Sequence, residues 1–364
     1  MNRQLGLFGD DEPAGSATEH GRGRGRTPPI RTTPSAAALR DLADHVPARV
    51  HLGTSSWSFP GWRGLVWSEE DPPPTKARLA RDGLAAYAAH PLLRGVGVDR
   101  TFYAPVPVET YAAWAKVVPE DFRFLVKTPR RLVEPRDRDG RANPDFLNAA
   151  ACEDELIQPA REGLGDRLGT VLVQFPPMRF RRTDDARRFI GRLHGFVSAF
   201  RQPNGPPIAV EVRDAVLVDD ELVSDYTAAV HEAGAAHTYV AHPLMPSVAE
   251  QVERIDASAA NHVVCRWMLR AGFSYEDARE VFSPFDRMVA PDVPTRRAVA
   301  ALCRAAVAGG QEVMVIANNK AEGSAPRTLA RLAAELTGVP GSDTGIAPES
   351  TATDDIDRDG RAAD

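Results

Sequence analysis

Cysteine is scarce in this chain of 364 residues. Cys152, Cys265 and Cys303 are odd in number, far apart and without a CxxC pair. Such a set argues against a disulfide framework and against a cysteine zinc site. We therefore expect a protein of the reducing cytoplasm.

Long apolar runs and the common cofactor motifs are also missing. No apolar stretch approaches the roughly 18 residues that span a bilayer, and the N-terminus lacks the apolar segment of a secretory signal, so no membrane partner is expected. The sequence contains no HxH or HExxH pattern, no clustered acidic ligands, no glycine-rich phosphate loop and no nucleophile elbow. It predicts neither a metal nor a cofactor.

Lysine is rare although basic residues are not. Of 44 basic residues only Lys76, Lys116, Lys127 and Lys320 are lysine, so each lysine position is more informative than an arginine. The net charge of −6 lies mainly at the C-terminal end, where residues 341–364 hold seven acids and two arginines. The rest of the chain is close to neutral, which excludes a polybasic nucleic-acid coat and leaves only local basic sites.

Both ends of the chain have the composition of disordered segments. Residues 1–45 include GRGRGRTPPIRTTPS, and residues 339–364 are rich in Gly, Pro, Ser, Thr and acids. These stretches have too little apolar surface to offset the entropy lost on ordering. We expect two disordered tails, the second acidic, around one folded domain over residues 46–338.

Strand-like runs alternate with helical patterns between the tails. Most runs are followed by a helical stretch, such as residues 183–200 or 325–336. This alternation over roughly 290 residues is typical of parallel βα units and favours a single closed (β/α)8 barrel of the α/β class. An open doubly wound sheet is the alternative, but no glycine fingerprint follows the first run. The expected strands are residues 50–57, 96–103, 122–129, 169–176, 208–213, 236–242, 262–267 and 312–319.

In such a barrel the active site lies at the carboxyl ends of the strands. Side chains alternate between the faces of a strand, so Glu211 and Arg213 share one face of the fifth run, while Ile208, Val210 and Val212 share the other. The apolar face suits the helix-covered outside, which places a glutamate and an arginine inside the barrel mouth. Charged side chains are rarely buried unless they are paired or functional. The alternative to a binding role is a structural ion pair that closes the barrel top.

Lys127 lies near the end of the third run and is expected inside by the same alternation. A lysine offers a compact charge and a pKa that burial can lower, which arginine does not. The alternative is a lysine that only extends its stem toward the surface. With Arg213 and Arg266 against Glu211 and Asp99, the mouth is locally basic. This composition predicts a small anionic ligand bearing phosphate or carboxylate, or a nucleic-acid fragment.

If the protein is an enzyme, these residues suggest acid–base chemistry without a metal, of hydrolase or lyase type. Lys127 and Glu211 are the candidate catalytic groups, with Glu211 as general acid or base or as an orienting group. The other polar or aromatic residues at the strand ends are candidate substrate contacts. These are Arg213, Arg266, Asn319, Tyr103, Trp57 and Gln174.

Several of the runs belong to longer motifs. These are GTSSWSFPGWRG (53–64), TFYAPVPVETYAAWAKVVPEDFRFLVKTPR (101–130), LVQFPP (172–177), AVEVR (209–213) and NNKAEGSAPRTLARL (318–332). In this order, over about residues 49–337, they resemble the YecE-like proteins, also called domain of unknown function 72. The resemblance implies a TIM-barrel-like fold and brings no established activity.

The chain departs from that family's pattern at positions that bear on chemistry. Family members tend to have an acid and an asparagine in strand two, where this chain has Gly97 and Asp99, and a Thr-His step after the strand-three lysine, where it has Arg130-Arg131. An Arg-aromatic-His pattern in strand seven ends in Met268 here. The framework of lysine, glutamate and arginines is retained while two candidate acid–base groups are missing, which implies a divergent branch with altered or lost chemistry.

The chain begins MNRQLGLFGDDEP, with an apolar cluster in an otherwise polar end. QLGLF resembles the linear motif by which bacterial DNA polymerases and repair proteins dock on the sliding clamp. In such a peptide Leu7 and Phe8 would be the apolar anchors beside Leu5, and Gln4 would supply a polar contact in a preformed groove. This predicts a bacterial sliding clamp as partner and, as the alternative function, a non-catalytic accessory role in DNA metabolism. The other interpretation is a chance apolar cluster.

Overall fold

Eight parallel strands close into a barrel in the computed structural model, which describes residues 28–69, 72–137, 139–202 and 205–339. The strands are β1 (Val50–Thr54), β2 (Gly95–Val98), β3 (Arg123–Lys127), β4 (Leu168–Gln174), β5 (Ile208–Glu211), β6 (Ala236–Ala241), β7 (His262–Trp267) and β8 (Glu312–Ala317). Each strand pairs with the next along the chain, and β8 pairs with β1. The predicted barrel is thereby confirmed and the open sheet is excluded.

Some predictions concern parts of the chain outside these ranges. Gln4, Leu5, Leu7 and Phe8, which are predicted to bind a sliding clamp, lie there, and so does the predicted acidic tail from residue 340 onward. Nothing in the fold bears on either prediction.

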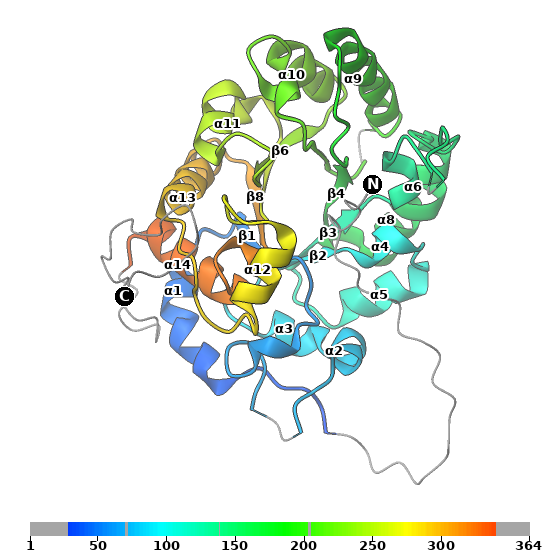
Figure 1. Ribbon diagram of the computed structural model, residues 1–364. Coiled ribbons are helices and arrows are strands. Elements are labelled where there is room, and N and C mark those ends of the chain that lie inside the picture. The colour runs from blue at the N-terminus through cyan, green and yellow to red at the C-terminus, as the bar shows by residue number, and fades with distance from the viewer. Residues whose placement is uncertain (1–27, 70–71, 138, 203–204, 340–364) are drawn as a thin grey trace.

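Helices follow the strands and surround the barrel in a ring (Figure 1). The α-helices are α1 (Arg40–His45), α2 (Lys76–Asp82), α3 (Leu84–Ala88), α4 (Arg100–Tyr103), α5 (Val108–Lys116), α6 (Arg130–Val133), α7 (Ala149–Cys152), α8 (Gln158–Leu164), α9 (Thr183–Ser198), α10 (Val223–Glu232), α11 (Val248–Arg254), α12 (Tyr275–Phe282), α13 (Val293–Ala308) and α14 (Ala325–Thr337). Shorter helical turns are η1 (Pro34–Leu39), η2 (Pro60–Trp62), η3 (Glu153–Ile157, a π-helix), η4 (Gly165–Arg167), η5 (Ala215–Val218), η6 (Ala257–Ala259) and η7 (Asn319–Ala321). The long helices pack through one apolar stripe each; α9, for example, buries Phe189, Ile190 and Leu193.

The apolar side chains form two layers, one on each face of the strands. The larger one lies between the strands and the helices and includes Phe124 and Val210. The smaller one fills the inside of the barrel and consists of Leu125, Leu172, Ala209, Val264, Met314 and Ile316. The predicted assignment of alternate residues of the third and fifth runs to the inside and the outside of the barrel is therefore confirmed. This assignment decides which side chains reach the barrel mouth.

The folded domain begins before residue 46. Residues 34–45 form η1 and α1, and Ile30, Leu42 and Ala43 are buried. The Thr33 amide donates to the Val66 carbonyl at 2.9 Å, which joins this segment to the loop after β1. The prediction of a disordered tail up to residue 45 is wrong for residues 34–45, because composition averaged over the whole end hid apolar residues spaced to contact the barrel.

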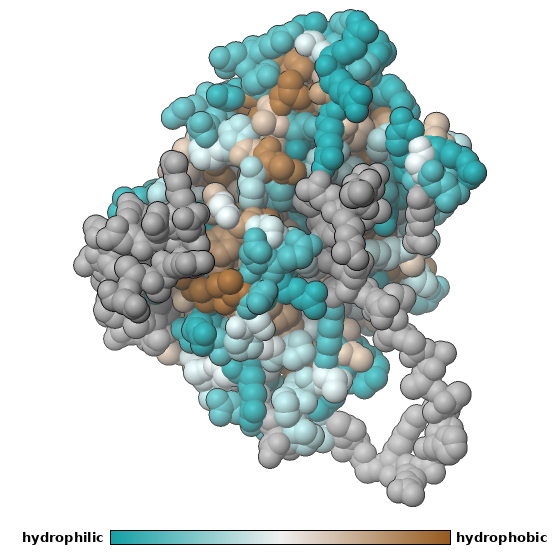
Figure 2. Space-filling model, viewed as in Figure 1, coloured by the Kyte–Doolittle hydropathy of each residue, from teal (hydrophilic) through white to brown (hydrophobic). Residues whose placement is uncertain are grey.

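The surface is largely polar. Figure 2 shows hydrophilic residues over most of the visible face and hydrophobic ones in small patches. Tyr103 and Val281 are the most exposed large apolar side chains of the described residues, at 54% and 52%. Within the same ranges, no helix combines the length and the apolar composition needed to cross a bilayer.

Candidate functional site

Polar side chains form a ring at the carboxyl ends of the strands. Because side chains alternate, a residue two positions beyond an inside-facing one also faces inside. This rule places five polar side chains directly above the inner apolar layer, at one end of the barrel. They are Lys127, Gln174, Glu211, Arg266 and Asn318, each two positions after a member of that layer.

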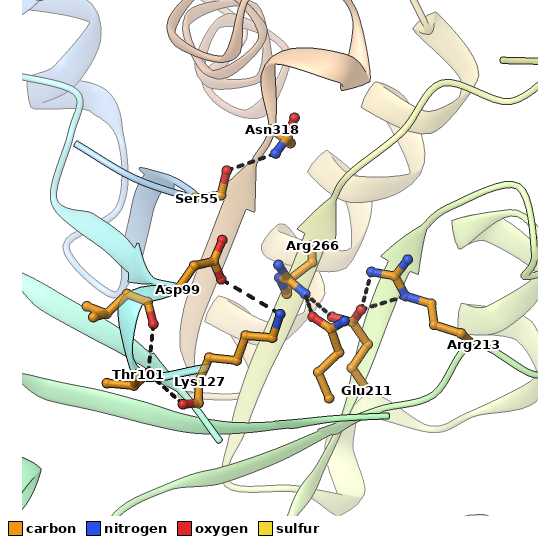
Figure 3. A network of polar contacts seen from close by, with 10 residues as sticks. Ser55, Asp99, Thr101, Lys127, Glu211, Arg213, Arg266 and Asn318 are labelled. Atoms are coloured by element: carbon orange, nitrogen blue, oxygen red, sulfur yellow. Dashed lines mark hydrogen bonds and ion pairs between the residues drawn. The ribbon is translucent and has the colours of Figure 1, made fainter. Parts of the chain in front are cut away.

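Glu211 lies in this ring between two arginines (Figure 3). Its Oε1 accepts a hydrogen bond from Arg213 Nε at 2.7 Å and lies 2.5 Å from Arg213 Nη2. Its Oε2 accepts from Arg266 Nη1 at 2.6 Å, and the same nitrogen donates to Gln174 Oε1 at 2.7 Å. None of these four residues is more than 9% exposed. The suggested ion pair between Glu211 and Arg213 is confirmed, and Arg266 extends it to a buried triad, the Glu211 triad.

The two guanidinium groups fix the charge of Glu211. Burial alone would raise the pKa of this carboxyl group, but attraction to Arg213 and Arg266 and their hydrogen bonds outweigh burial and lower the pKa of Glu211 to about 2. The carboxylate is therefore ionised at neutral pH and both its oxygens are occupied. This arrangement supports Glu211 as the orienting group and argues against its use as general acid or base. Two positive charges against one negative leave the triad cationic.

Lys127 lies beside the Glu211 triad at the end of β3 and is 6% exposed (Figure 3). Its Nζ lies 4.0 Å from Asp99 Oδ1 and 3.8 Å from the centre of the Phe102 ring. Desolvation, with repulsion from the triad arginines, lowers the pKa of Lys127 to about 8, although attraction to Asp99 and Glu211 opposes the shift. The ring face also favours the charged form. Near neutral pH a fraction of Lys127 is the uncharged amine, which can accept a proton or attack an electrophile.

Asp99 reaches the ring because the chain turns after β2. The strand ends at Val98, and Asp99 directly precedes α4. Thr101 Oγ1 donates to the carbonyl oxygens of Val98 and Lys127 at 3.0 and 2.6 Å. These bonds hold the turn against the end of β3 and keep the Asp99 carboxylate near the lysine amine. The expectation of one strand over residues 96–103 is therefore wrong: the strand ends at Val98, and residues 100–103 form α4.

His242, the last residue of the sixth predicted run, was missed as a site residue. Burial, followed by repulsion from Arg213, lowers the pKa of His242 to about 3, so its ring is neutral at physiological pH. Its Nδ1 accepts a hydrogen bond from the Leu244 amide at 3.2 Å, which leaves the proton of the neutral ring on Nε2. His242 is therefore an uncharged hydrogen-bond donor close to the triad. Its place at a strand end was the signal in the sequence.

Two predicted contacts, Trp57 and Tyr103, lie outside the ring. Trp57 is 7% exposed, donates its indole N–H to the Ala80 carbonyl at 3.3 Å and packs edge-on against Trp114. Tyr103 belongs to α4, not to a strand end, and its ring is among the most exposed in the described residues. Trp57 is therefore a core residue, and Tyr103 is a surface residue.

Asn319 also lies outside the ring, and its neighbour Asn318 takes its place. Asn319 Oδ1 accepts from Trp62 Nε1 at 3.0 Å and from the Ala325 amide at 2.9 Å, which fixes the start of α14. Asn318 instead donates through Nδ2 to Ser55 Oγ at 3.0 Å, which joins the ends of the neighbouring strands β8 and β1 at the mouth (Figure 3). Alternation from Ile316 distinguishes the two asparagines.

A second buried glutamate lies after β8. Glu322 Oε1 accepts from the Asp292 amide at 2.6 Å and from Arg296 Nη2 at 2.7 Å, and its backbone carbonyl accepts from Val289 and Ala290. Burial raises the pKa of Glu322 despite the attraction of Arg296. These bonds fasten the segment between α12 and α13 to the barrel. We call Glu322, Asp292 and Arg296 the anchor cluster.

A cavity of about 780 Å³ opens at the other end of the barrel. Its lining comes from the starts of the strands and includes His51, Arg123, Thr170 and His262, but no residue of the ring. In (β/α)8 barrels the amino ends of the strands serve stability, whereas the carboxyl ends carry the chemistry. The ring is therefore the stronger candidate site.

The thiols and metal-binding side chains do not form a competing centre in the described ranges. There, no three His, Cys, Asp or Glu side chains gather in a way that could hold a metal ion. The three cysteines are buried, and desolvation raises the pKa of Cys152 and of Cys303 to about 12. Thiols with such pKa values stay protonated and are poor nucleophiles.

Similar proteins share this architecture. The structure is similar to that of a DUF72 family protein from Enterococcus faecalis V583, with a TM-score of 0.53, 22% sequence identity and coverage of 80% of this chain and 96% of that one. It is also similar to a DUF72 family protein from Thermotoga maritima MSB8, with a TM-score of 0.52, 18% identity and coverage of 78% and 97%. At these identities the likeness shows the fold alone.

The family is decided by the sequence. No curated protein matches the chain. The family model "Protein of unknown function DUF72" matches residues 51–350, which is most of the chain. This match confirms the resemblance seen in the motifs: the chain belongs to the DUF72 family.

Proposed function

We propose that the ring binds a small anionic ligand, bearing phosphate or carboxylate, and exchanges protons with it through Lys127. The observation that carries this proposal is the Glu211 triad, in which two buried guanidinium groups share one carboxylate. Burying such charges is costly, and the surplus positive charge would be balanced by a bound anion. Arg266 Nε is buried without a hydrogen-bond partner among the described residues, so protein groups do not saturate the triad.

Each ring residue then has a distinct part. Arg213 and Arg266 hold the anion, because guanidinium groups bind carboxylate and phosphate through paired hydrogen bonds. Glu211 fixes the orientation of both arginines. Lys127, with a pKa of about 8, exchanges the proton, and His242 donates its Nε2–H. This division supports metal-independent acid–base chemistry of lyase or hydrolase type.

The test is direct binding of inorganic phosphate and of L-lactate, measured by isothermal titration calorimetry at constant ionic strength, with glycerol as the uncharged control. We expect saturable binding of at least one anion and none of glycerol. Arg213→Lys keeps the charge beside Glu211 but loses the paired N–H geometry. The dissociation constant should then rise about tenfold, equivalent to about 1.4 kcal/mol.

The matched control is Arg187→Lys, which changes a half-exposed arginine of α9 that pairs with Asp225. It should leave the dissociation constant unchanged. If neither anion binds saturably, or if both variants weaken binding equally, the ring is not the anion site.

A further inference from the structure

We infer that Lys127 is a nucleophile that forms an imine with a small carbonyl compound bearing a carboxylate or phosphate group. This inference rests on the anion site proposed above and names its substrate class. The shared chemistry of the class is a carbonyl carbon next to the anionic group or a few bonds from it. The 2-oxo acids and the keto phosphates both satisfy this description.

The first support is the position of the amine. Lys127 ends an inner strand face directly above Leu125, and its Nζ lies over the Phe102 ring and beside the cationic triad. Desolvation and neighbouring cations are the two means by which proteins activate a lysine as a nucleophile. This chain uses arginine for 40 of its 44 basic residues, yet lysine occupies this position. Arginine could supply the charge but could not form an imine.

The second support is that two hydroxyl groups at the mouth are hydrogen-bonded and that the thiols are inert. Thr101 Oγ1 donates to two backbone carbonyls. Ser55 Oγ accepts from Asn318. The buried thiols stay protonated, since their pKa values are raised. Among the described residues of the ring, the amine of Lys127 is thus the group best suited to attack a carbonyl carbon.

The third support is a carboxylate placed to move the protons. Asp99 Oδ1 lies 4.0 Å from Lys127 Nζ, and its side chain is 43% exposed, so it faces both the amine and the solvent. The neutral amine attacks the carbonyl carbon, the π electrons move to oxygen, and proton transfer gives a carbinolamine. Loss of water then forms the C=N bond: the former carbonyl oxygen leaves as water with the two hydrogens that the neutral amine carried. Asp99 relays the proton from nitrogen to the departing hydroxyl.

The arginines explain why the carbonyl compound should be an anion. Arg213 and Arg266 are joined through Glu211 on one side of the mouth, and Lys127 lies next to them (Figure 3). An anion held by the guanidinium groups would present the adjoining carbonyl to Nζ. An uncharged ketone would lack this attachment and should react far more slowly.

The test is reductive trapping on the full chain at pH 8 with sodium cyanoborohydride, followed by peptide mass spectrometry. Pyruvate and dihydroxyacetone phosphate are the two probes, and they distinguish the carboxylate from the phosphate source. Acetone lacks the anion, and L-lactate lacks the carbonyl. Trapping adds the mass of the probe less one oxygen. We expect at least one probe to label Lys127 tenfold or more above the exposed Lys116, with acetone and lactate giving no such preference.

Two variants complete the test. Lys127→Arg should abolish the preferential label, and Lys116→Arg should leave it unchanged. Labelling of Lys127 no greater than that of Lys116, or equal labelling by acetone, overturns the inference. If Lys127 is not labelled while phosphate or lactate still binds, the imine is wrong and the anion site stands. If neither anion binds, the proposed function itself fails.

Discussion

Two buried glutamates at the same end of the barrel, Glu211 and Glu322, both accept hydrogen bonds from arginine but differ in their surroundings. Glu322 has one arginine, Arg296, as its hydrogen-bonded cation, and burial outweighs the attraction of that arginine and keeps the pKa of Glu322 raised. Glu211 has two arginines, which outweigh burial and lower its pKa. One carboxyl group is thus short of positive charge, and the other has a surplus.

The difference separates a structural role from a binding role. The bonds of Glu322 reach the backbone at Asp292, Val289 and Ala290, so they hold a loop in place. The carboxylate of Glu211 instead bonds only to side chains that face the barrel mouth, and Lys127 adds a third cation there. Burying three cations around one carboxylate does not favour stability, and such sacrifices of stability are typical of functional sites.

Replacing each glutamate by glutamine tests this contrast most strongly. Glu211→Gln leaves two buried guanidinium groups without a counter-charge and should lower the free energy of unfolding by about 3–5 kcal/mol. Glu322→Gln keeps an oxygen that accepts from the Asp292 amide and should cost about 1–3 kcal/mol. Urea denaturation at pH 7, followed by circular dichroism, measures both. Equal losses would mean that the triad is an anchor like the other cluster.

Acid should sharpen the contrast, because the two pKa values are shifted in opposite directions. The pKa of Glu211 is about 2 in the fold against an ordinary 4.5. Its contribution to stability is therefore present above pH 4.5 and is lost as the pH falls toward 2, by about 3 kcal/mol in total. The pKa of Glu322 is raised, so its contribution is present at low pH and is lost as the pH rises through that pKa.

The measurement is a series of urea denaturation curves from pH 6 to pH 3. The gap in unfolding free energy between wild type and Glu211→Gln should narrow as the pH falls. The gap between wild type and Glu322→Gln should widen over the same range. If both differences in unfolding free energy change in the same direction with pH, the opposite pKa shifts assigned to Glu211 and Glu322 are contradicted.

The fold was predictable because its signals are local. β-Branched runs of a few residues followed by amphipathic stretches recur along the chain, and all eight predicted strands are present. The boundary near residue 46 was not predictable from composition, since the apolar residues of α1 are few and are buried only because α1 packs against α14. An average of the amino-acid composition over a segment does not show which of its side chains are buried against another element.

The site was predictable wherever the strand end was right. Alternation from correctly placed strands leads to Lys127, Glu211, Gln174 and Arg266. The prediction fails at Tyr103 because the chain has left β2 at Val98 and turned into α4. It fails at Asn319 because the neighbouring Asn318 is the residue on the inside face, and a shift of one residue reverses the face. The charge states of Glu211 and His242 could not be predicted, because they depend on burial and on arginines that only the fold brings near, Arg266 of β7 for Glu211 and Arg213 for His242.

The smallest expected change in the free energy of unfolding is that caused by replacing Lys127, and it is an increase, whereas the glutamate replacements lower this free energy. Lys127 has a pKa of about 8 in the fold against an ordinary 10.5, so the folded state binds this proton less tightly than the unfolded chain. The resulting loss of stability is complete below pH 8 and disappears as the pH rises to 10.5. Lys127→Met has a similar length and no charge. We expect it to raise the free energy of unfolding at pH 7 by about 2 kcal/mol, after allowance for the lost contact with Phe102.

The matched change in the anchor cluster is Arg296→Met, which should destabilise the fold because Glu322 loses its cationic partner. Urea denaturation at pH 7 and pH 9.5 compares the two variants with wild type. The gain from Lys127→Met should shrink at the higher pH, because more of the wild-type lysine is then neutral in the fold while the unfolded chain still holds its proton. If Lys127→Met instead lowers stability as Arg296→Met does, Lys127 is a structural cation and the contrast between the two clusters does not hold.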